Sequence, residues 1–248
     1  AIVNLINIVQ SEVVQAVLPV SKTQDIKNII LATKNGTIKK TSIDKFKNIR
    51  QTGLTAIKLD ADDQLIWAKA TTGEDQIFLV THNGKCIRFD EKDTRPMGRH
   101  TRGVRGILLK DNDYLVSMDV VPAKIGKDKK DAFRHLLTVT EFGVGKRSDV
   151  YQYPIQKRGG VGVKVSSISE KTGKIAAAQV VCEKDNQVIL ISKKAVTIKL
   201  ALKNIPTLNR NTKGVILMRL KNGEDKVGTM TVIQDQETEA IPLETVQK

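Results

Sequence analysis

Lysine and arginine recur at equivalent places along this sequence, and they are the side chains best suited to a chemical role. One set follows a turn glycine and the other precedes a second glycine: Lys40, Arg88, Arg147 and Lys199, and Arg50, Arg99, Arg158 and Arg210. Both cations neutralise phosphates and release the counterions bound to them. Such contacts hold DNA by its backbone without reading its base sequence. The repeated cations therefore predict a binding surface for duplex DNA.

Further basic residues accompany the second set of cations. We expect additional DNA contacts from Arg102, Arg105, Lys157 and Lys213. The neighbouring glycines allow two interpretations, because a missing side chain lets backbone amides approach phosphates and also permits a tight bend between strands. Both interpretations apply to the same residues: Gly103, Gly106, Gly159, Gly160 and Gly162.

Histidines and nucleophiles form no catalytic pattern. His82, His100 and His135 are 18 and 35 residues apart, and no HExxH or GxSxG motif is present. The segment GVGKRS at 143–148 departs from a Walker A loop, because threonine stands at 140 where glycine is needed and arginine at 147 where Ser or Thr is needed. We therefore expect no catalytic residue, no metal site and no cofactor in this chain.

The charge of the whole chain agrees with a polyanionic partner. Its 41 lysines and arginines exceed its 27 aspartates and glutamates, which leaves a formal net charge of +14. Nucleic acid is the first candidate and an anionic membrane the second. Aromatic residues make up 4% of the chain, few for a surface that stacks single-stranded bases. Duplex DNA is thus the better ligand.

The ends of the chain and its cysteines bear on its location. The apolar start AIVNLINIVQSEVVQAVLPV has no basic region and contains Glu12 and Pro19, so it fits neither a signal peptide nor a membrane helix. Cys86 and Cys182 make neither a disulfide framework nor a metal-ligand pair. We expect a soluble cytoplasmic protein without a membrane partner.

The elements that place these cations repeat along the chain. Four segments align without gaps: NIILATKNGTIKKT (28–41), QIFLVTHNGKCIRF (76–89), HLLTVTEFGVGKRS (135–148) and QVILISKKAVTIKL (187–200). Their turn residues Gly36, Gly84, Gly143 and Ala195 lie 48, 59 and 52 residues apart. This is the period of the blades in propeller-type folds.

Each repeat contains four short β-rich runs, for example 28–33, 36–42, 54–59 and 64–70. The pattern predicts an all-β, propeller-like fold of four-stranded blades, with a half blade at 1–22 and full blades at about 23–72, 73–122, 131–182 and 183–233. Residues 234–248 are polar and acidic, and we expect them to form a flexible tail. Equivalent cations on neighbouring blades would line one rim.

The string FLVTHNGKCIRFDEKDTRPMGRHTRGVRGILL resembles a blade of the C-terminal domain of bacterial DNA gyrase A, and LLTVTEFGVGKRSDVYQYPIQKRGGVG and RNTKGVILMRL are similar to later blades. The resemblance implies a β-pinwheel of six blades that exchange strands and wrap DNA around a basic rim. It also implies partners, namely the rest of gyrase A and the gyrase B protein in an A2B2 enzyme associated with the nucleoid. The ATP and magnesium used for supercoiling belong to other parts of that enzyme.

The segment QKRGGVG is similar to the QRRGGKG box of this family. It comprises Gln156, Lys157, Arg158, Gly159, Gly160, Val161 and Gly162, and it departs from the box at Lys157 and Val161. By repeat order the box itself should precede residue 1. We therefore expect 156–162 to be an equivalent DNA-contacting loop of a later blade.

Two alternatives remain open. The C-terminal domain of topoisomerase IV is related and carries a degraded box, so a QRRGGKG sequence upstream would favour gyrase. A basic propeller that scaffolds protein partners is the alternative from another class. Binding of DNA that weakens steeply with salt separates DNA binding from scaffolding.

Overall fold

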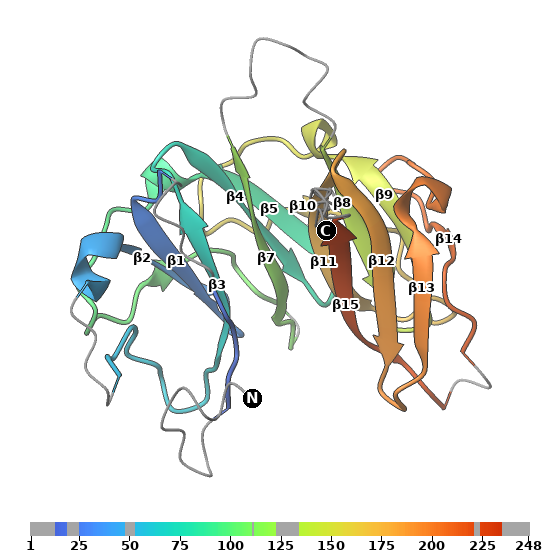
Figure 1. The fold of residues 1–248 in the computed structure, drawn as a ribbon, viewed down its shortest axis with the longest axis horizontal. Coiled ribbons are helices and arrows are strands. Elements are labelled where there is room, and N and C mark those ends of the chain that lie inside the picture. Colours follow the sequence, from blue (N-terminus) through green and yellow to red (C-terminus); the bar gives the residue numbers. More distant parts are fainter. Residues whose placement is uncertain are drawn as a thin grey trace, which may run out of the picture.

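The computed structural model describes residues 13–18, 25–47, 53–110, 112–122, 134–220 and 224–234. Within these ranges the chain forms four antiparallel sheets, which follow one another around an arc in sequence order (Figure 1). The predicted all-β, propeller-like class is confirmed. No helix in the same ranges is long and apolar enough to cross a membrane.

Each sheet is built on a hairpin at the first turn of a repeat. The hairpins are β1 (Asn28–Thr33) with β2 (Thr37–Ser42), β4 (Asp75–Thr81) with β5 (Lys85–Asp90), β8 (Arg134–Thr140) with β9 (Val144–Asp149), and β12 (Asp185–Ser192) with β13 (Thr197–Ala201). These turns need a left-handed backbone. Gly36, Gly84, Gly143 and Ala195 accordingly have φ of 81°, 74°, 76° and 63°. Ala195 is thus equivalent to the three glycines, as the alignment predicts.

A third long strand pairs with the other side of each hairpin. These strands are β3 (Leu65–Thr71), β7 (Leu115–Pro122), β11 (Ile175–Cys182) and β15 (Val227–Gln234). They form the inner side of the arc, where β3 contacts β7, β7 contacts β11, and β11 contacts β15 (Figure 1). The second hairpin strands β2, β5, β9 and β13 therefore lie toward the outside.

The fourth strand of a sheet comes from the next repeat. β6 (Val104–Arg105) pairs with β2, β10 (Val163–Lys164) with β5, and β14 (Val215–Ile216) with β9. The run expected as a strand at 54–59 forms none. The equivalent segments of later repeats join the preceding sheet, which is the strand exchange that the family resemblance implies. The donated strand pairs backbone groups that an outer edge would otherwise leave open. In the described residues, β13 receives no such strand.

A glycine stands before each donated strand, where two backbones approach closely. Gly103, Gly162 and Gly214 have φ of 105°, 73° and 99°. A Cβ at any of them would collide with a backbone carbonyl of the receiving strand. The tight-bend interpretation is thus confirmed for Gly103 and Gly162.

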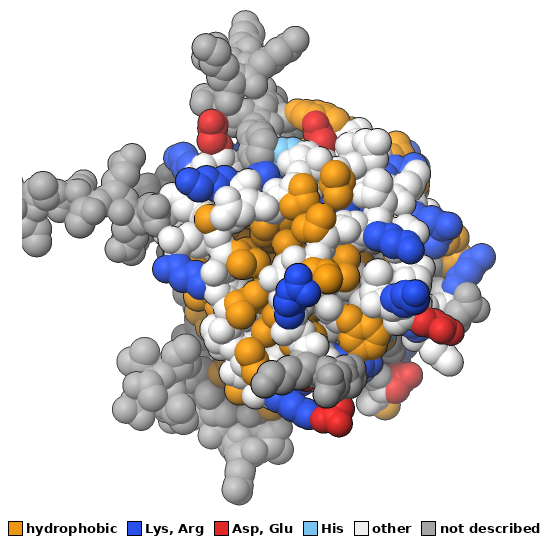
Figure 2. Space-filling view, turned by 90° about the vertical axis from the view of Figure 1, so that its right-hand side faces the viewer, with side chains coloured by type: hydrophobic (Ala, Val, Ile, Leu, Met, Phe, Trp, Pro, Cys, Tyr) orange, Lys and Arg blue, Asp and Glu red, His pale blue; other side chains and the backbone are white. Residues whose placement is uncertain are grey.

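Apolar side chains fill the spaces between neighbouring sheets. Ile38 and Leu79 pack between the first two sheets, Phe78 and Val165 between the second and third, and Leu190 with its neighbours between the last two. Burying one such side chain contributes about 1.5–3 kcal/mol. At the end of the arc where β13 and β14 lie, apolar side chains are visible among lysines and arginines (Figure 2).

A short 3₁₀ turn follows each second hairpin strand. The turns are η2 (Ile43–Phe46), η3 (Glu91–Asp93), η5 (Val150–Gln152) and η6 (Leu202–Asn204). Ser42, Asp90 and Asp149 cap the first three turns by accepting a hydrogen bond from the backbone N–H two residues further on. The chain then leaves the turn and runs toward the preceding sheet.

The predicted terminal segments lie mostly outside the described residues. Of the half blade expected at 1–22, residues 13–18 are described and contain no strand. Of the tail expected at 234–248, only Gln234 is described, and it ends β15.

Candidate nucleic-acid interface

The first set of predicted cations lies where one repeat crosses the next. Lys40, Arg88 and Arg147 are on the outer strands β2, β5 and β9, beside the chain that leaves the following 3₁₀ turn. Their backbone carbonyls accept hydrogen bonds of 2.7, 2.8 and 2.8 Å from the N–H groups of Met97, Gln156 and Leu208, respectively. The side chains of the three cations bind the same stretches of chain.

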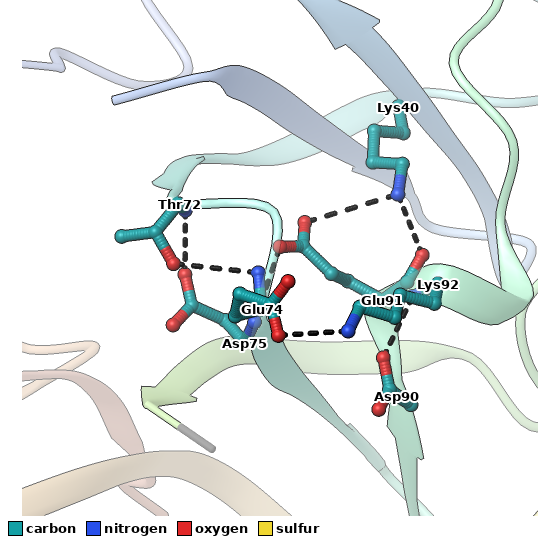
Figure 3. A network of polar contacts seen from close by, with 7 residues as sticks. All are labelled: Lys40, Thr72, Glu74, Asp75, Asp90, Glu91 and Lys92. Carbon is teal, nitrogen blue, oxygen red and sulfur yellow. Dashed lines mark hydrogen bonds and ion pairs between the residues drawn. The ribbon is translucent and has the colours of Figure 1, made fainter. Parts of the chain in front are cut away.

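Lys40 illustrates this role (Figure 3). Its Nζ donates to the Glu91 carbonyl oxygen at 2.7 Å and lies 4.0 Å from the Glu91 carboxylate. Lys40 is 5% exposed and Glu91 is 0% exposed. The other carboxylate oxygen of Glu91 accepts from the Asp75 backbone N–H at 3.1 Å. A buried charge pair thus joins the first sheet to the second.

Figure 3 also shows how this pair is supported. Asp75 accepts a hydrogen bond of 2.7 Å from the Thr72 backbone N–H, which fixes the turn into β4. At the surface, Lys92 pairs with Glu74 at 2.7 Å. Burial lowers the pKa of Lys40, and the Glu91 carboxylate counteracts this by favouring the charged amine. The network is structural, and it is directed inward.

Arg88 and Arg147 repeat this arrangement in the next two sheets. Arg88 is 7% exposed and donates to the carbonyl oxygens of Val150 and Tyr153 at 3.0 and 3.1 Å. Arg147, which is partly buried, donates to the Ile205 carbonyl at 2.8 Å. Burial lowers the pKa of both guanidinium groups. Each cation therefore holds the 3₁₀ turn of the following repeat.

Burial contradicts two of the predicted DNA contacts. Lys40 and Arg88 direct their charged groups into the joints between sheets, where a phosphate cannot reach them. Arg147 binds the same kind of turn but stays partly exposed. Lys199 is exposed on β13, which in the described residues has no following repeat beside it. For Arg147 and Lys199, DNA contact stays a prediction.

The second set of predicted cations lies on surface loops. Arg99, Arg158 and Arg210 belong to the loops 98–103, 157–162 and 209–214, each between a 3₁₀ turn and a donated strand. Parallel bridges of Lys40 with Pro96, Arg88 with Ile155, and Arg147 with Thr207 place the approach to each loop beside an outer strand. The loops therefore recur on the outer side of three successive sheets. Arg50 lies outside the described residues.

Hydrogen bonds join the loop of one repeat to the repeat before it. Arg158 donates to the carbonyl oxygens of Asp93 at 2.9 Å and Arg105 at 3.1 Å. Arg210 donates to the Lys164 carbonyl at 3.1 Å. The backbone N–H of Gly159 donates to Gly106 at 2.6 Å. These guanidinium groups are oriented by the protein, and an arginine has five N–H donors, which leaves donors beyond these bonds for a phosphate.

Four other predicted DNA contacts are exposed side chains of these loops and the strands that follow: Arg102, Arg105, Lys157 and Lys213. Arg102 pairs with Asp60 at 3.0 Å, and Lys157 pairs with Asp93 at 2.8 Å while 90% of its side chain is exposed. Surface ion pairs of this kind contribute little to the free energy of folding. A phosphate can replace the carboxylate, so these pairs do not prevent DNA contact. We call the following residues the rim cations: Arg99, Arg102, Arg105, Lys157, Arg158, Arg210 and Lys213.

The box-like segment 156–162 forms one of these loops. Gly159 has a φ of 81°, and a Cβ on Gly159 or Gly160 would meet its nearest neighbours at ordinary contact distances. Gly162 is tightly packed against β5. Gln156 binds the Arg88 carbonyl through its backbone, and Val161 is partly buried. An approach of phosphate to the backbone at 159–160 stays a prediction.

Two buried lysines were missed by the sequence reasoning. Lys39 and Lys146 are both 0% exposed, and their amines bind backbone carbonyls of loops 98–103 and 209–214. A signal was present in the repeat, since the equivalent positions read Lys39, Ile87, Lys146 and Ile198. Isoleucine at two of four positions indicates an inward-facing site. Neighbouring cations at 40 and 147 concealed this pattern.

Comparison with known proteins shows the family to which this architecture belongs. A family model described as "DNA gyrase C-terminal domain, beta-propeller" matches residues 27–72, 75–122, 134–182 and 186–233. The chain belongs to this family. Each match covers one hairpin and its inner strand, and the last three also contain the strand donated to the preceding sheet.

Relatives and solved structures agree with this membership. The DNA gyrase A protein of Escherichia coli (strain K12) is 37% identical over 96% of this chain, which spans 26% of that relative. A crystal structure of the C-terminal domain of DNA topoisomerase IV has a TM-score of 0.81 at 26% identity and covers 94% of this chain and 70% of its own. A DNA gyrase A C-terminal domain structure has a TM-score of 0.77 at 26% identity, covering 94% and 74%. The predicted resemblance is confirmed.

Proposed function

We propose that this gyrase-family domain binds duplex DNA along its outer side and bends it around the arc of sheets. The observation that carries this proposal is the recurrence of the rim cations on equivalent loops of successive repeats. A bent duplex presents phosphates along its inner side, and cations on three successive loops offer contacts at several places along it. No base-reading element is required, because the contacts are to phosphates.

The energetics favour such a complex. The net charge of +14 attracts DNA from a distance and raises the association rate. Smoothly bending 20–30 base pairs costs on the order of 1–6 kcal/mol. Charge-assisted hydrogen bonds between arginine and phosphate are among the strongest that proteins form. Several of them, spread over three loops, offset a bending cost of this size.

Removing exposed rim cations tests the proposal. We expect the triple variant Arg105→Gln, Lys157→Gln and Lys213→Gln to bind a random-sequence duplex about 100-fold more weakly, since each lost phosphate contact costs on the order of 1 kcal/mol. Fluorescence anisotropy of a labelled duplex measures this. The fold should persist, because these side chains are exposed.

A matched control removes the same charge elsewhere. Lys171, Lys174 and Lys193 are exposed and belong to other loops, at the approach to β11 and after β12. Their replacement by glutamine should weaken binding far less. Equal losses in both triple variants would show that net charge alone attracts DNA, and they would contradict a rim.

The chain spans about a quarter of its gyrase relatives, so its role in a whole enzyme is part of the proposal. We infer that it works with the rest of gyrase A and with gyrase B at the nucleoid in the cytoplasm. There, a wrapped DNA segment would be presented to the ATP-driven core for negative supercoiling. Supercoiling by the reassembled enzyme should fall in the triple rim variant and persist in the control variant.

A second candidate is the equivalent domain of topoisomerase IV. This candidate is supported by the TM-score of 0.81 to the C-terminal domain of topoisomerase IV, compared with 0.77 to the gyrase domain. The same reassembled enzyme separates the two candidates. Negative supercoiling of relaxed DNA supports gyrase, whereas relaxation and decatenation without supercoiling support topoisomerase IV.

A further inference from the structure

We propose that Lys39 and Lys146 are positioning residues for DNA binding, each holding from beneath a loop that carries rim cations of the next repeat. This inference rests on the proposed function, since its effect on affinity requires DNA to bind the loops. Neither lysine reaches the surface. They act through the backbone to which the rim arginines are attached.

Lys146 makes the more complete set of contacts. Its Nζ donates to the carbonyl oxygens of Asn209 at 2.6 Å and Arg210 at 2.8 Å, and lies 3.2 Å from the Thr212 hydroxyl. The Thr212 hydroxyl in turn donates to the Asn209 carbonyl at 2.8 Å. The amine thus binds several polar groups on the inner side of loop 209–214, including the carbonyl of a rim arginine.

Lys39 holds the equivalent loop of an earlier repeat. Its Nζ donates to the Ala56 carbonyl at 2.7 Å and to the Arg99 carbonyl. Thr101 takes the place of Thr212, with its hydroxyl donating to the Gly98 carbonyl at 3.0 Å. The backbone carbonyl of the rim arginine is again bound by the lysine. The two sites share the bond from the lysine to the arginine carbonyl, whereas the second partner is Ala56 for Lys39 and loop 209–214 itself for Lys146.

The second repeat shows that the fold itself does not need a lysine here. Lys39, Ile87 and Lys146 occupy the same hairpin register, opposite Leu31, Leu79 and Thr138. Ile87 is 0% exposed and faces loop 157–162, which has Gly160 where the other loops have threonine. A lysine on the strand thus accompanies a threonine in the loop, whereas the isoleucine accompanies a glycine. The fold thus accepts either an apolar or a charged side chain at this position.

Burying an ammonium group is costly unless several hydrogen bonds compensate. A lysine that replaces a tolerated isoleucine must therefore have a role besides packing. Holding the arginine carbonyl inward keeps its partial negative charge away from the side on which phosphates approach. It also fixes the backbone from which Arg99 or Arg210 extends, so less conformational entropy is lost on binding.

The experiment uses the full chain and a random-sequence duplex. Lys39→Met and Lys146→Met should each weaken DNA binding about fivefold. Ile87→Met is the matched control, because it places methionine at the equivalent site without removing a charge, and it should leave affinity unchanged. Lys146→Ile adds a side chain that this fold already accepts at Ile87.

A double-mutant cycle separates positioning from charge. If Lys146 acts through Arg210, the losses from Lys146→Met and Arg210→Ala should be non-additive, with a coupling of about fivefold. The same holds for Lys39 with Arg99. Hydrogen exchange of the Thr101 and Thr212 backbone N–H groups should accelerate in the lysine variants without DNA, and remain unchanged in Ile87→Met.

The outcomes are distinguishable. Additive losses of DNA affinity would show that the lysines act only as distant charges, and they would overturn the inference. Unchanged DNA affinity and unchanged hydrogen exchange in the lysine variants would also overturn it. If arginine variants weaken binding and lysine variants do not, the inference fails while the proposed function stands. A chain that binds no duplex ends both.

Discussion

Adjacent cations on one strand have different roles, because their side chains leave opposite faces of the sheet. Lys39 supports a rim loop, whereas Lys40 joins two sheets through Glu91. Neither role is visible from residue type, since both residues read as surface lysines. Charge recurrence led to the prediction that Lys40, Arg88 and Arg147 contact DNA, whereas their side chains bind the 3₁₀ turn of the following repeat. They join one repeat to the next. Residue type does not reveal this, because only burial distinguishes a structural cation from one that binds DNA.

The Lys40–Glu91 pair gives a prediction about stability. Lys40→Met leaves the Glu91 carboxylate buried without its cation, and we expect the free energy of unfolding to fall by about 3 kcal/mol. Urea denaturation measures this. Combining Lys40→Met with Glu91→Gln should recover part of the loss. DNA affinity of the folded single variant should not change, and a loss at constant fold would restore Lys40 to the DNA-contacting set.

Lys146 gives a prediction about pH. Burial lowers the pKa of its amine from 10.5 to about 8. Between these values the unfolded chain binds more protons than the folded chain, so the unfolding free energy rises as pH increases through this window. Relative to Lys146→Met, the unmodified chain should gain about 2 kcal/mol between about pH 7.5 and 10. Parallel stability curves for the two proteins would contradict the lowered pKa.

At the scale of elements, the local sequence pattern predicted the hairpins, whereas the exchanged strands were expected only from the family resemblance. Aligned β-rich runs on either side of Gly36 and Gly84 predicted the pairs β1 with β2 and β4 with β5 closely. The donated strands are two residues long and pair with partners in another repeat, so no local pattern marks them. Their glycines were visible, and two interpretations were open. Only the position of the receiving strand decides between them.

The donated strand depends on a glycine, which predicts a contrast within one loop. Gly103→Ala places a Cβ against the Ile38 carbonyl at a φ of 105°, and we expect a loss of about 2 kcal/mol or more in unfolding free energy. Gly98→Ala is the control, because nothing lies within 4 Å of a Cβ there. Thermal unfolding compares the two variants. Equal unfolding midpoints for the two variants would contradict the close packing of the Gly103 backbone against β2.

At the scale of the molecule, strand exchange links the joints to the rim. Because each repeat completes the sheet before it, the loop leading to the donated strand must pass over an outer strand. The rim cations lie on these loops and, for Arg105, on the donated strand β6, so the same connection that closes a sheet presents charge outward. The curvature of the arc then sets how successive loops face a duplex (Figure 1).

The salt dependence of binding to a random-sequence duplex tests this account most directly. With the rim cations engaged, log K should fall with log salt at a slope of roughly −6, and the triple rim variant should have a slope nearer about −3. Anisotropy titrations between low and moderate salt supply both values. A slope near zero, or one that the rim substitutions leave unchanged, would contradict a DNA-binding rim.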